Sequence, residues 1–160
     1  DDQSVLFAIN EYLSQPGRNA EKEAWCAEEV KKQPNDKFLW AFLGESQMNQ
    51  QKYDEAVASF KKTMEIDPNF IEVEYNIGAS LVLKATTMKD QLSGTTGRLT
   101  PADAEKVKAV YTEAQKYLEH VRSVDPDRKK VNWAYTLYQV YYGLGDATKT
   151  AEIEKLMGGE

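Results

Sequence analysis

The sequence contains one cysteine and one histidine among its 160 residues. A single cysteine excludes a disulfide within the chain, and no histidines and cysteines are spaced as metal ligands are. Glycine-rich loops of the kind that cradle phosphate groups are also missing. We therefore expect no metal site, no cofactor and no catalytic residue, and we predict that the chain is not an enzyme.

Cysteine and histidine often act as catalytic residues, but neither Cys26 nor His120 has neighbours in the sequence that would support catalysis. Cys26 lies between Trp25 and Ala27, and the sequence offers no second histidine or other base that would activate its thiol. His120 follows Glu119 and precedes Arg122 by two positions. These neighbours predict a solvent-facing place near a helix C-terminus, where a cation is mildly favoured.

Positive charge is in the minority, with 20 lysines and arginines against 26 acidic residues and a net charge of −6. This balance argues against binding to nucleic acid or to anionic membranes, and a basic protein partner fits better. No apolar run approaches 18 residues, so we expect no membrane-spanning segment. A hydrophobic content of 41% is enough for a folded core.

Proline is scarce, and three of the five prolines recur in similar surroundings. The stretches "KQPNDK", "EIDPNF" and "SVDPDR" contain Pro34, Pro68 and Pro126. The spacings are 68 − 34 = 34 and 126 − 68 = 58, and 58 equals 34 + 24. Proline ends one helix and suits the first turn of the next. The spacing therefore predicts a 34-residue helical repeat that is interrupted once by 24 residues.

The segment 37–70 shows the repeat most clearly. Its apolar residues recur every three or four positions in two blocks separated by "NQQKY", which predicts two amphipathic helices. Gly44 inside the first helix costs about 1 kcal/mol relative to alanine, so we expect the second helix to approach closely there. Ala56 and Phe60 share one face of that second helix.

These residues resemble the tetratricopeptide repeat, whose pattern is W-x2-L-G-x2-Y, then A-x3-F, then P. The matching residues are Trp40, Leu43, Gly44, Ala56, Phe60 and Pro68, whereas Gln47 stands where the pattern has tyrosine. A second copy resumes after the interruption, because Tyr111, Ala114 and Leu118 follow Tyr53, Ala56 and Phe60 by 58 residues.

The resemblance implies an all-α fold, a right-handed solenoid of about four antiparallel helix pairs in a single domain of residues 1–160. Residues 1–36 form a degenerate first repeat, in which Lys22 occupies the small-residue position. The intact repeat is 37–70, the interrupted one 71–128, and the last repeat and cap 129–160. In this cap Thr150 and Glu154 replace the usual alanine and phenylalanine.

The 24 extra residues continue the apolar spacing of both helices of the third pair, which predicts an extended hairpin over residues 84–110. The stretch "SGTTGRL" predicts the turn, followed by Thr100 as N-cap and Pro101 at the first helical position. The hairpin is either a tolerated lengthening or a contact surface for a partner or a second copy.

In proteins similar to this one, the first helix of each repeat lines a concave groove. Residues were assigned to this groove position by position along the repeats. The partner-binding residues implied by the resemblance are Phe38, Glu45, Met48, Glu72, Tyr75, Asn76, Val82, Asn132, Tyr135, Gln139 and Tyr142. The alternative for Tyr75, Tyr135 and Tyr142 is that they pack against neighbouring helices.

The function implied by the resemblance is a non-enzymatic protein-interaction module, an adaptor or scaffold that binds a peptide or a partner's helix in the groove. The alternative is a structural or oligomerising module that acts through hairpin 84–110. The layout, with "VYYGLGD" near the end, is also similar to exported tetratricopeptide proteins of Bacteroides-like bacteria. That similarity implies a periplasmic or envelope location in a Gram-negative bacterium, with the cytoplasm as the alternative.

Overall fold

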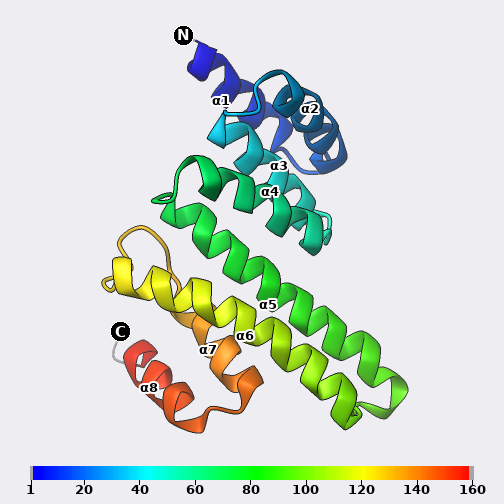
Figure 1. The fold of residues 1–160 in the computed structure, drawn as a ribbon, viewed down its shortest axis with the longest axis vertical. Helices are drawn as coiled ribbons and strands as arrows, with labels where there is room; N and C mark the ends of the chain where they lie inside the picture. Colours follow the sequence, from blue (N-terminus) through cyan, green and yellow to red (C-terminus); the bar gives the residue numbers. More distant parts are fainter. Residues whose placement is uncertain (1, 159–160) are drawn as a thin grey trace. The chain divides into compact units, whose positions relative to one another are not determined.

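A computed structural model describes residues 2–158, which fold into eight α-helices and contain no β-strand (Figure 1). The all-α prediction is therefore confirmed. The helices are α1 Asp2–Leu13, α2 Asn19–Lys32, α3 Lys37–Asn49, α4 Tyr53–Ile66, α5 Ile71–Ser93, α6 Pro101–Val124, α7 Ala134–Leu144 and α8 Ala147–Met157. A short 3-10 helix, η1 Gly94–Thr96, lies between α5 and α6.

Consecutive helices pair as hairpins, α1 with α2, α3 with α4, α5 with α6 and α7 with α8. The chain forms two compact units, residues 1–73 and residues 74–160, with the boundary in the first turn of α5. No helix among residues 2–158 combines the length and the apolar character that crossing a membrane requires. The single-domain organisation and the right-handed superhelix stay predictions.

Glycine allows two of these hairpins to close tightly. A Cβ atom added at Gly44 would lie 2.6 Å from the ring of Phe60, which belongs to the second helix of the same hairpin. At Gly78 of α5 the added atom would lie 2.6 Å from Leu118 of α6. Phe60 and Leu118 are both fully buried. The structure thus confirms the reason expected for Gly44, and it shows the same contact one repeat later.

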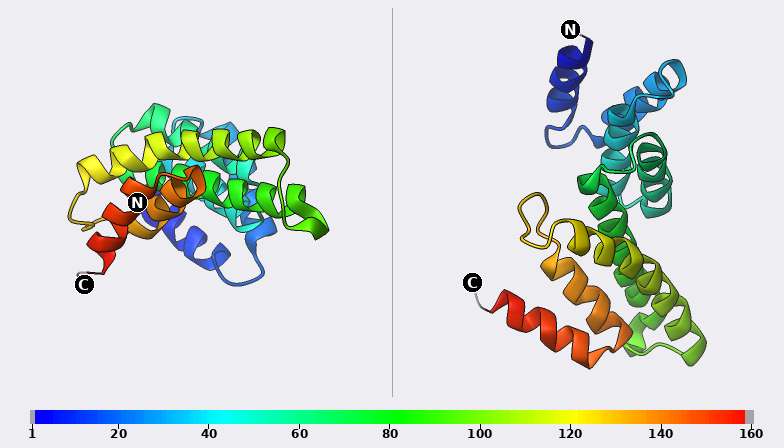
Figure 2. Two further views of the ribbon diagram at one scale, coloured as in Figure 1. Left: turned by 90° about the horizontal axis from the view of Figure 1, so that it is seen from below. Right: turned by 60° about the vertical axis from the view of Figure 1, so that its left-hand side comes forward.

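The inserted residues lengthen α5 and α6 to 23 and 24 residues, compared with 13 and 14 residues in α3 and α4. At about 1.5 Å per residue, α5 is about 35 Å long and α3 about 20 Å. The two long helices lie side by side (Figures 1 and 2). The Thr100 side chain accepts a hydrogen bond from the backbone N–H of Asp103 at 3.1 Å, with Pro101 at the first helical position. The predicted helix start is therefore confirmed.

The linker between α6 and α7 is organised around the buried side chain of Asp125. Its carboxylate accepts hydrogen bonds from the backbone N–H groups of Lys129, Lys130 and Val131, at 3.0, 2.9 and 3.0 Å. Its backbone carbonyl accepts one from the indole of Trp133 at 2.7 Å. The bonds from Val131, Lys130 and Lys129 hold the pKa of Asp125 below its usual value.

This linker corrects one expectation about the last repeat. The basic run 128–130 wraps around Asp125, and α7 begins only at Ala134. Asn132, a predicted groove residue, consequently lies in the linker and not on a helix. The physical reason is that one carboxylate accepts hydrogen bonds from three successive backbone N–H groups. Residues held in this way cannot adopt a helical conformation.

We predict that Asp125→Asn destabilises the protein at neutral pH, because an amide is a weaker acceptor for three N–H groups than a carboxylate. The lowered pKa stabilises the fold above the usual carboxyl pKa, and this contribution is lost as the pH falls through the folded-state value. Urea unfolding should therefore show the largest difference between wild type and variant near pH 7. A difference that stays constant down to about pH 2 would contradict the role of the carboxylate charge.

We predict that Gly44→Ala lowers the free energy of unfolding, although alanine is the better helix former. The overpacking against Phe60 is expected to cost about 1 to 3 kcal/mol, against about 1 kcal/mol gained in helix propensity. Chemical denaturation measures the net effect. In a Phe60→Ala background the same substitution should become neutral or stabilising, and an equal loss in both backgrounds would rule out the contact as the cause.

Candidate interaction site

Three tyrosines form a stacked row along one side of α7. The ring centroids of Tyr135 and Tyr138 are 6.1 Å apart, and those of Tyr138 and Tyr142 are 6.0 Å apart, with interplanar angles of 18° and 23°. Residues three and four apart share a helix face, so the stacking follows from the spacing. Tyr135 and Tyr142 are 61% and 67% exposed, the highest values among the exposed large hydrophobic side chains of the described residues. We call these three residues the tyrosine row.

Contacts with α6 orient α7 so that the tyrosine row faces outward. A Cβ atom added at Gly143 would lie 2.5 Å from the ring of Tyr111 in α6. The buried Tyr141 donates a hydrogen bond from its hydroxyl group to Glu119 of α6 at 2.8 Å. Burial and this bond together raise the pKa of Tyr141. One side of α7 is thereby committed to α6, and the tyrosine row occupies the other.

Two hollows lie beside Tyr142 within residues 74–160. One has a volume of about 300 Å³ and is lined by Tyr142, Gly145, Ala147, Thr150, Ala151 and Glu154. The other, about 170 Å³, lies against α6 and includes Val107, Tyr111 and Tyr142 in its lining. Tyr142 therefore lies between the two hollows, a position that suits an anchor residue of a contact surface.

The middle tyrosine was missed by the sequence analysis, which assigned Tyr135 and Tyr142 to the groove but not Tyr138. Tyr138 is half-buried, and burial together with the nearby carboxylate of Glu154 raises its pKa. Its spacing of three and four residues from its neighbours was the signal that would have identified it.

The other predicted groove residues of this unit have mixed surroundings. Tyr75 is half-buried, and its hydroxyl lies 2.9 Å from that of Thr136, which links α5 to α7. Asn76 and Gln139 are also half-buried. Val82 is only 2% exposed, so it has no surface to offer a partner. The expectation of an exposed Val82 is thus corrected, because this face of α5 belongs to the core.

In the first unit, Phe38 lies among three other phenylalanines. Its ring centroid is 5.0 Å from that of Phe7, 6.4 Å from Phe42 and 5.9 Å from Phe70. Phe38 is therefore half-buried by its aromatic neighbours. Of the remaining predicted positions, Met48 is half-buried and Glu72 is exposed.

The two candidate reactive side chains are both engaged. Cys26 is fully buried, and burial raises the pKa of its thiol to about 12, so it is protonated at neutral pH. The Nδ1 atom of the exposed His120 lies 2.7 and 2.9 Å from the two carboxylate oxygens of Glu74. Within residues 2–158, no group of three or more histidine, cysteine, aspartate and glutamate side chains is placed to hold a metal ion.

One family model matches a segment of the chain. The sequence model of the family described as "Tetratricopeptide repeat" matches residues 38–70. This segment is similar to a tetratricopeptide repeat. They coincide with the hairpin of α3 and α4, in which the contact between Gly44 and Phe60 was found.

Similar proteins include two peroxisomal targeting signal receptors. The receptor of Candida albicans is 37% identical over 49 residues, which cover 31% of this chain and 8% of the receptor. The receptor of Saccharomyces cerevisiae is 32% identical over 47 residues, which cover 29% of this chain and 8% of the receptor. The matched part spans less than a tenth of each receptor.

A solved structure, MamA residues 41 to the end from Desulfovibrio magneticus RS-1, is similar over 99% of this chain and 94% of that one. The sequence identity is 20% and the TM-score is 0.47.

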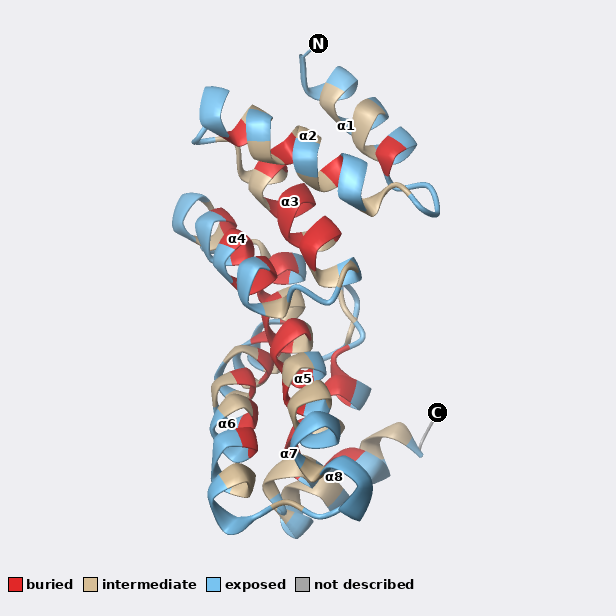
Figure 3. Ribbon diagram, turned by 90° about the vertical axis from the view of Figure 1, so that its right-hand side faces the viewer, coloured by how far each residue is buried: buried red, intermediate tan, exposed pale blue. Residues whose placement is uncertain are grey.

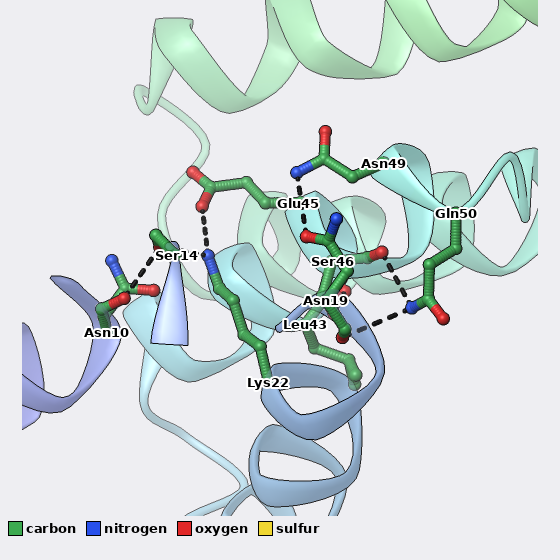
Figure 4. A network of polar contacts seen from close by, with 9 residues as sticks. All are labelled: Asn10, Ser14, Asn19, Lys22, Leu43, Glu45, Ser46, Asn49 and Gln50. Atoms are coloured by element: carbon green, nitrogen blue, oxygen red, sulfur yellow. Dashed lines mark hydrogen bonds and ion pairs between the residues drawn. The ribbon is translucent and has the colours of Figure 1, made fainter. Parts of the chain in front are cut away.

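The first hairpin departs from the tetratricopeptide repeat at Lys22, since 56 − 34 = 22 places it at the position of Ala56. Lys22 is only 2% exposed. Its ammonium group donates hydrogen bonds to Glu45 at 2.9 Å and to the hydroxyl of Ser14 at 3.1 Å (Figure 4). The ammonium group also lies 5.4 Å from the ring centroid of Phe42. Glu45, predicted as an acidic point of the groove, thus has a partner inside its own unit.

We predict that Glu45→Gln lowers the free energy of unfolding by about 1 to 3 kcal/mol, because it leaves the buried ammonium of Lys22 without a counter-charge. Glu28→Gln is the control, since Glu28 pairs with Lys31 at 2.7 Å but both side chains are exposed. Its loss should be below about 0.5 kcal/mol. Equal midpoints for the two variants in chemical denaturation would contradict this account of Glu45.

Proposed function

We propose that this chain is a non-enzymatic protein-interaction module and that residues 74–160 bind a peptide or a partner's helix on the tyrosine row. The observation that carries the proposal is the exposure of Tyr135 and Tyr142 in a stacked arrangement beside two hollows. Polar groups for the same surface would come from Gln139 of α7 and from Tyr75 and Asn76 of α5, which the repeat pattern assigns to it.

Tyrosine is well suited to this task. A tyrosine buries about 150 to 250 Å² when it is covered, and its few rotatable bonds make ordering inexpensive. The stacking against Tyr138 already restrains the rings of Tyr135 and Tyr142 before a partner arrives. Preorganised anchors of this kind lower the entropic cost of binding.

The larger of the two hollows favours a partner segment with apolar side chains and some positive charge, whereas Lys89 and Lys108 line the smaller one. The hollow beside Tyr142 is lined by Ala147, Ala151 and Thr150, which suit an apolar side chain, and by the carboxylate of Glu154. The net charge of −6 also favours a cationic partner. An extended or helical peptide with apolar anchors and a lysine or arginine meets both conditions.

The comparisons support the coarser part of the proposal, that the chain recognises protein. The tetratricopeptide repeat model matches residues 38–70, and the partly similar proteins are named as receptors of a targeting signal. Phe38, Met48 and Glu72 belong to residues 1–73, and their role in binding stays a prediction from their repeat positions alone. An extracytoplasmic location is proposed only from the sequence similarity to exported tetratricopeptide proteins.

The alternative function is self-association through hairpin 84–110, and the exposed apolar residues of α5 give it little support. Leu83 and Leu92 are the exposed large hydrophobic residues of α5. They are nine residues apart, and nine steps of about 100° place them on opposite sides of the helix. They therefore form no common apolar patch, and the tyrosine row remains the stronger candidate.

We predict that peptides selected against the wild-type protein from a random displayed library bind the Tyr135→Ala, Tyr142→Ala double variant at least tenfold more weakly. Loss of two aromatic anchors removes the largest area a partner can cover. Tyr12→Ala is the matched control, because Tyr12 is 51% exposed but lies on α1. A selection in which every peptide keeps full affinity for the double variant would refute the tyrosine row as the site.

A further inference from the structure

The first hairpin lacks the contact that closes the second. The 34-residue offset places Asn10 at the position of Gly44, Lys22 at that of Ala56 and Cys26 at that of Phe60. Lys22 extends between α1 and α3 to reach Ser14 and Glu45 (Figure 4). The side-chain oxygen of Asn10 is buried there without a hydrogen-bond partner. Asn10 and Lys22 are thus larger and more polar than the small residues of the tetratricopeptide repeat, and Cys26 is smaller than the phenylalanine. The contact that closes α3 on α4 is therefore missing between α1 and α2.

The helices α1 and α2 diverge from the turn that joins them, as the right-hand view of Figure 2 shows. A hollow of about 480 Å³ lies between them and the start of α3. Its apolar lining consists of Val5, Leu6, Ile9, Trp25 and Leu39. In α1 the only buried residue is Leu13, at the end of the helix, so most of α1 is left uncovered (Figure 3).

The polar lining of the hollow is acidic. Asp2, Glu29 and Asp36 contribute to it, together with Gln3 and Gln33, and no lysine or arginine does. Asp36 accepts hydrogen bonds from the N–H groups of Phe38 and Leu39 as the N-cap of α3. Glu29 pairs with Lys32 at 2.7 Å, but the lysine side chain is exposed and the pair contributes little.

We propose that this hollow binds a segment of a partner protein that carries an apolar side chain next to a lysine or arginine. Its volume falls within the range of about 300 to 1,000 Å³ typical of ligand sites. The apolar side chain would cover Leu6 and Trp25, which are half-buried, and the cation would meet Glu29 at the rim. The site lies in residues 1–73 and is separate from the tyrosine row, so either proposal can fail without the other.

The test uses the complete 160-residue chain labelled with 5-fluorotryptophan, whose three tryptophans give three ¹⁹F resonances. Replacement of each tryptophan by phenylalanine assigns them. The probe is an acetylated, amidated hexapeptide of alternating leucine and lysine, and its counterpart replaces each lysine by glutamate. We expect the lysine peptide to shift the Trp25 resonance in a saturable way, with little effect on Trp133. An equal shift by the glutamate peptide, or no shift of Trp25, would overturn the proposal.

A pair of adjacent variants tests the role of the acidic rim. Glu29→Gln should weaken binding of the lysine peptide about two- to fivefold, the size expected for one partly exposed charge pair. Glu28→Gln removes the same charge from the neighbouring position. Glu28 also pairs with a lysine three residues later at 2.7 Å, but it is more exposed than Glu29 and does not line the hollow. Equal weakening by both variants would show general attraction to an acidic protein and would overturn the assignment to this site.

Discussion

Close approach of two helices at a glycine is the constraint on which the closed hairpins depend. Gly44 leaves room for Phe60, Gly78 leaves room for Leu118, and Gly143 brings α7 against Tyr111. Each glycine gives up about 1 kcal/mol of helix propensity in exchange for a fully packed contact. The third of these contacts turns one side of α7 toward α6 and so leaves Tyr135, Tyr138 and Tyr142 on the outside. Where the glycine is replaced, at Asn10, the hairpin stays open.

Local signals in the sequence predicted much of this architecture. The prolines and the 34-residue period identified the hairpins, the apolar spacing identified the lengthened α5 and α6, and Thr100 with Pro101 marked the start of α6. These features depend on residues a few positions apart, which sequence patterns report well. The role of Gly44 was also predictable, because a glycine inside a helix needs a compensating contact.

Contacts between distant residues limited the prediction of the candidate site. The repeat pattern assigned Asn132 to a helix, but the carboxylate of Asp125 holds the preceding N–H groups in a linker. It assigned Glu45 to a binding surface, but Lys22, 23 residues earlier, takes its charge. The position of a residue in the repeat determines which way its side chain points. The charged partner of that side chain depends on other residues, which the repeat pattern does not specify. Both proposed surfaces nevertheless favour the same chemistry, an apolar side chain beside a cation.

Amide hydrogen exchange on the free protein tests the central claim most directly, because it measures how firmly each helix is held. If glycine contacts close the hairpins, amides in the middle of α3 and α4 should exchange only through global unfolding. Amides in the middle of α1, whose hairpin is held open by Asn10 and Lys22, should exchange far faster although they are helical. Equal protection of α1 and α3 would contradict the account.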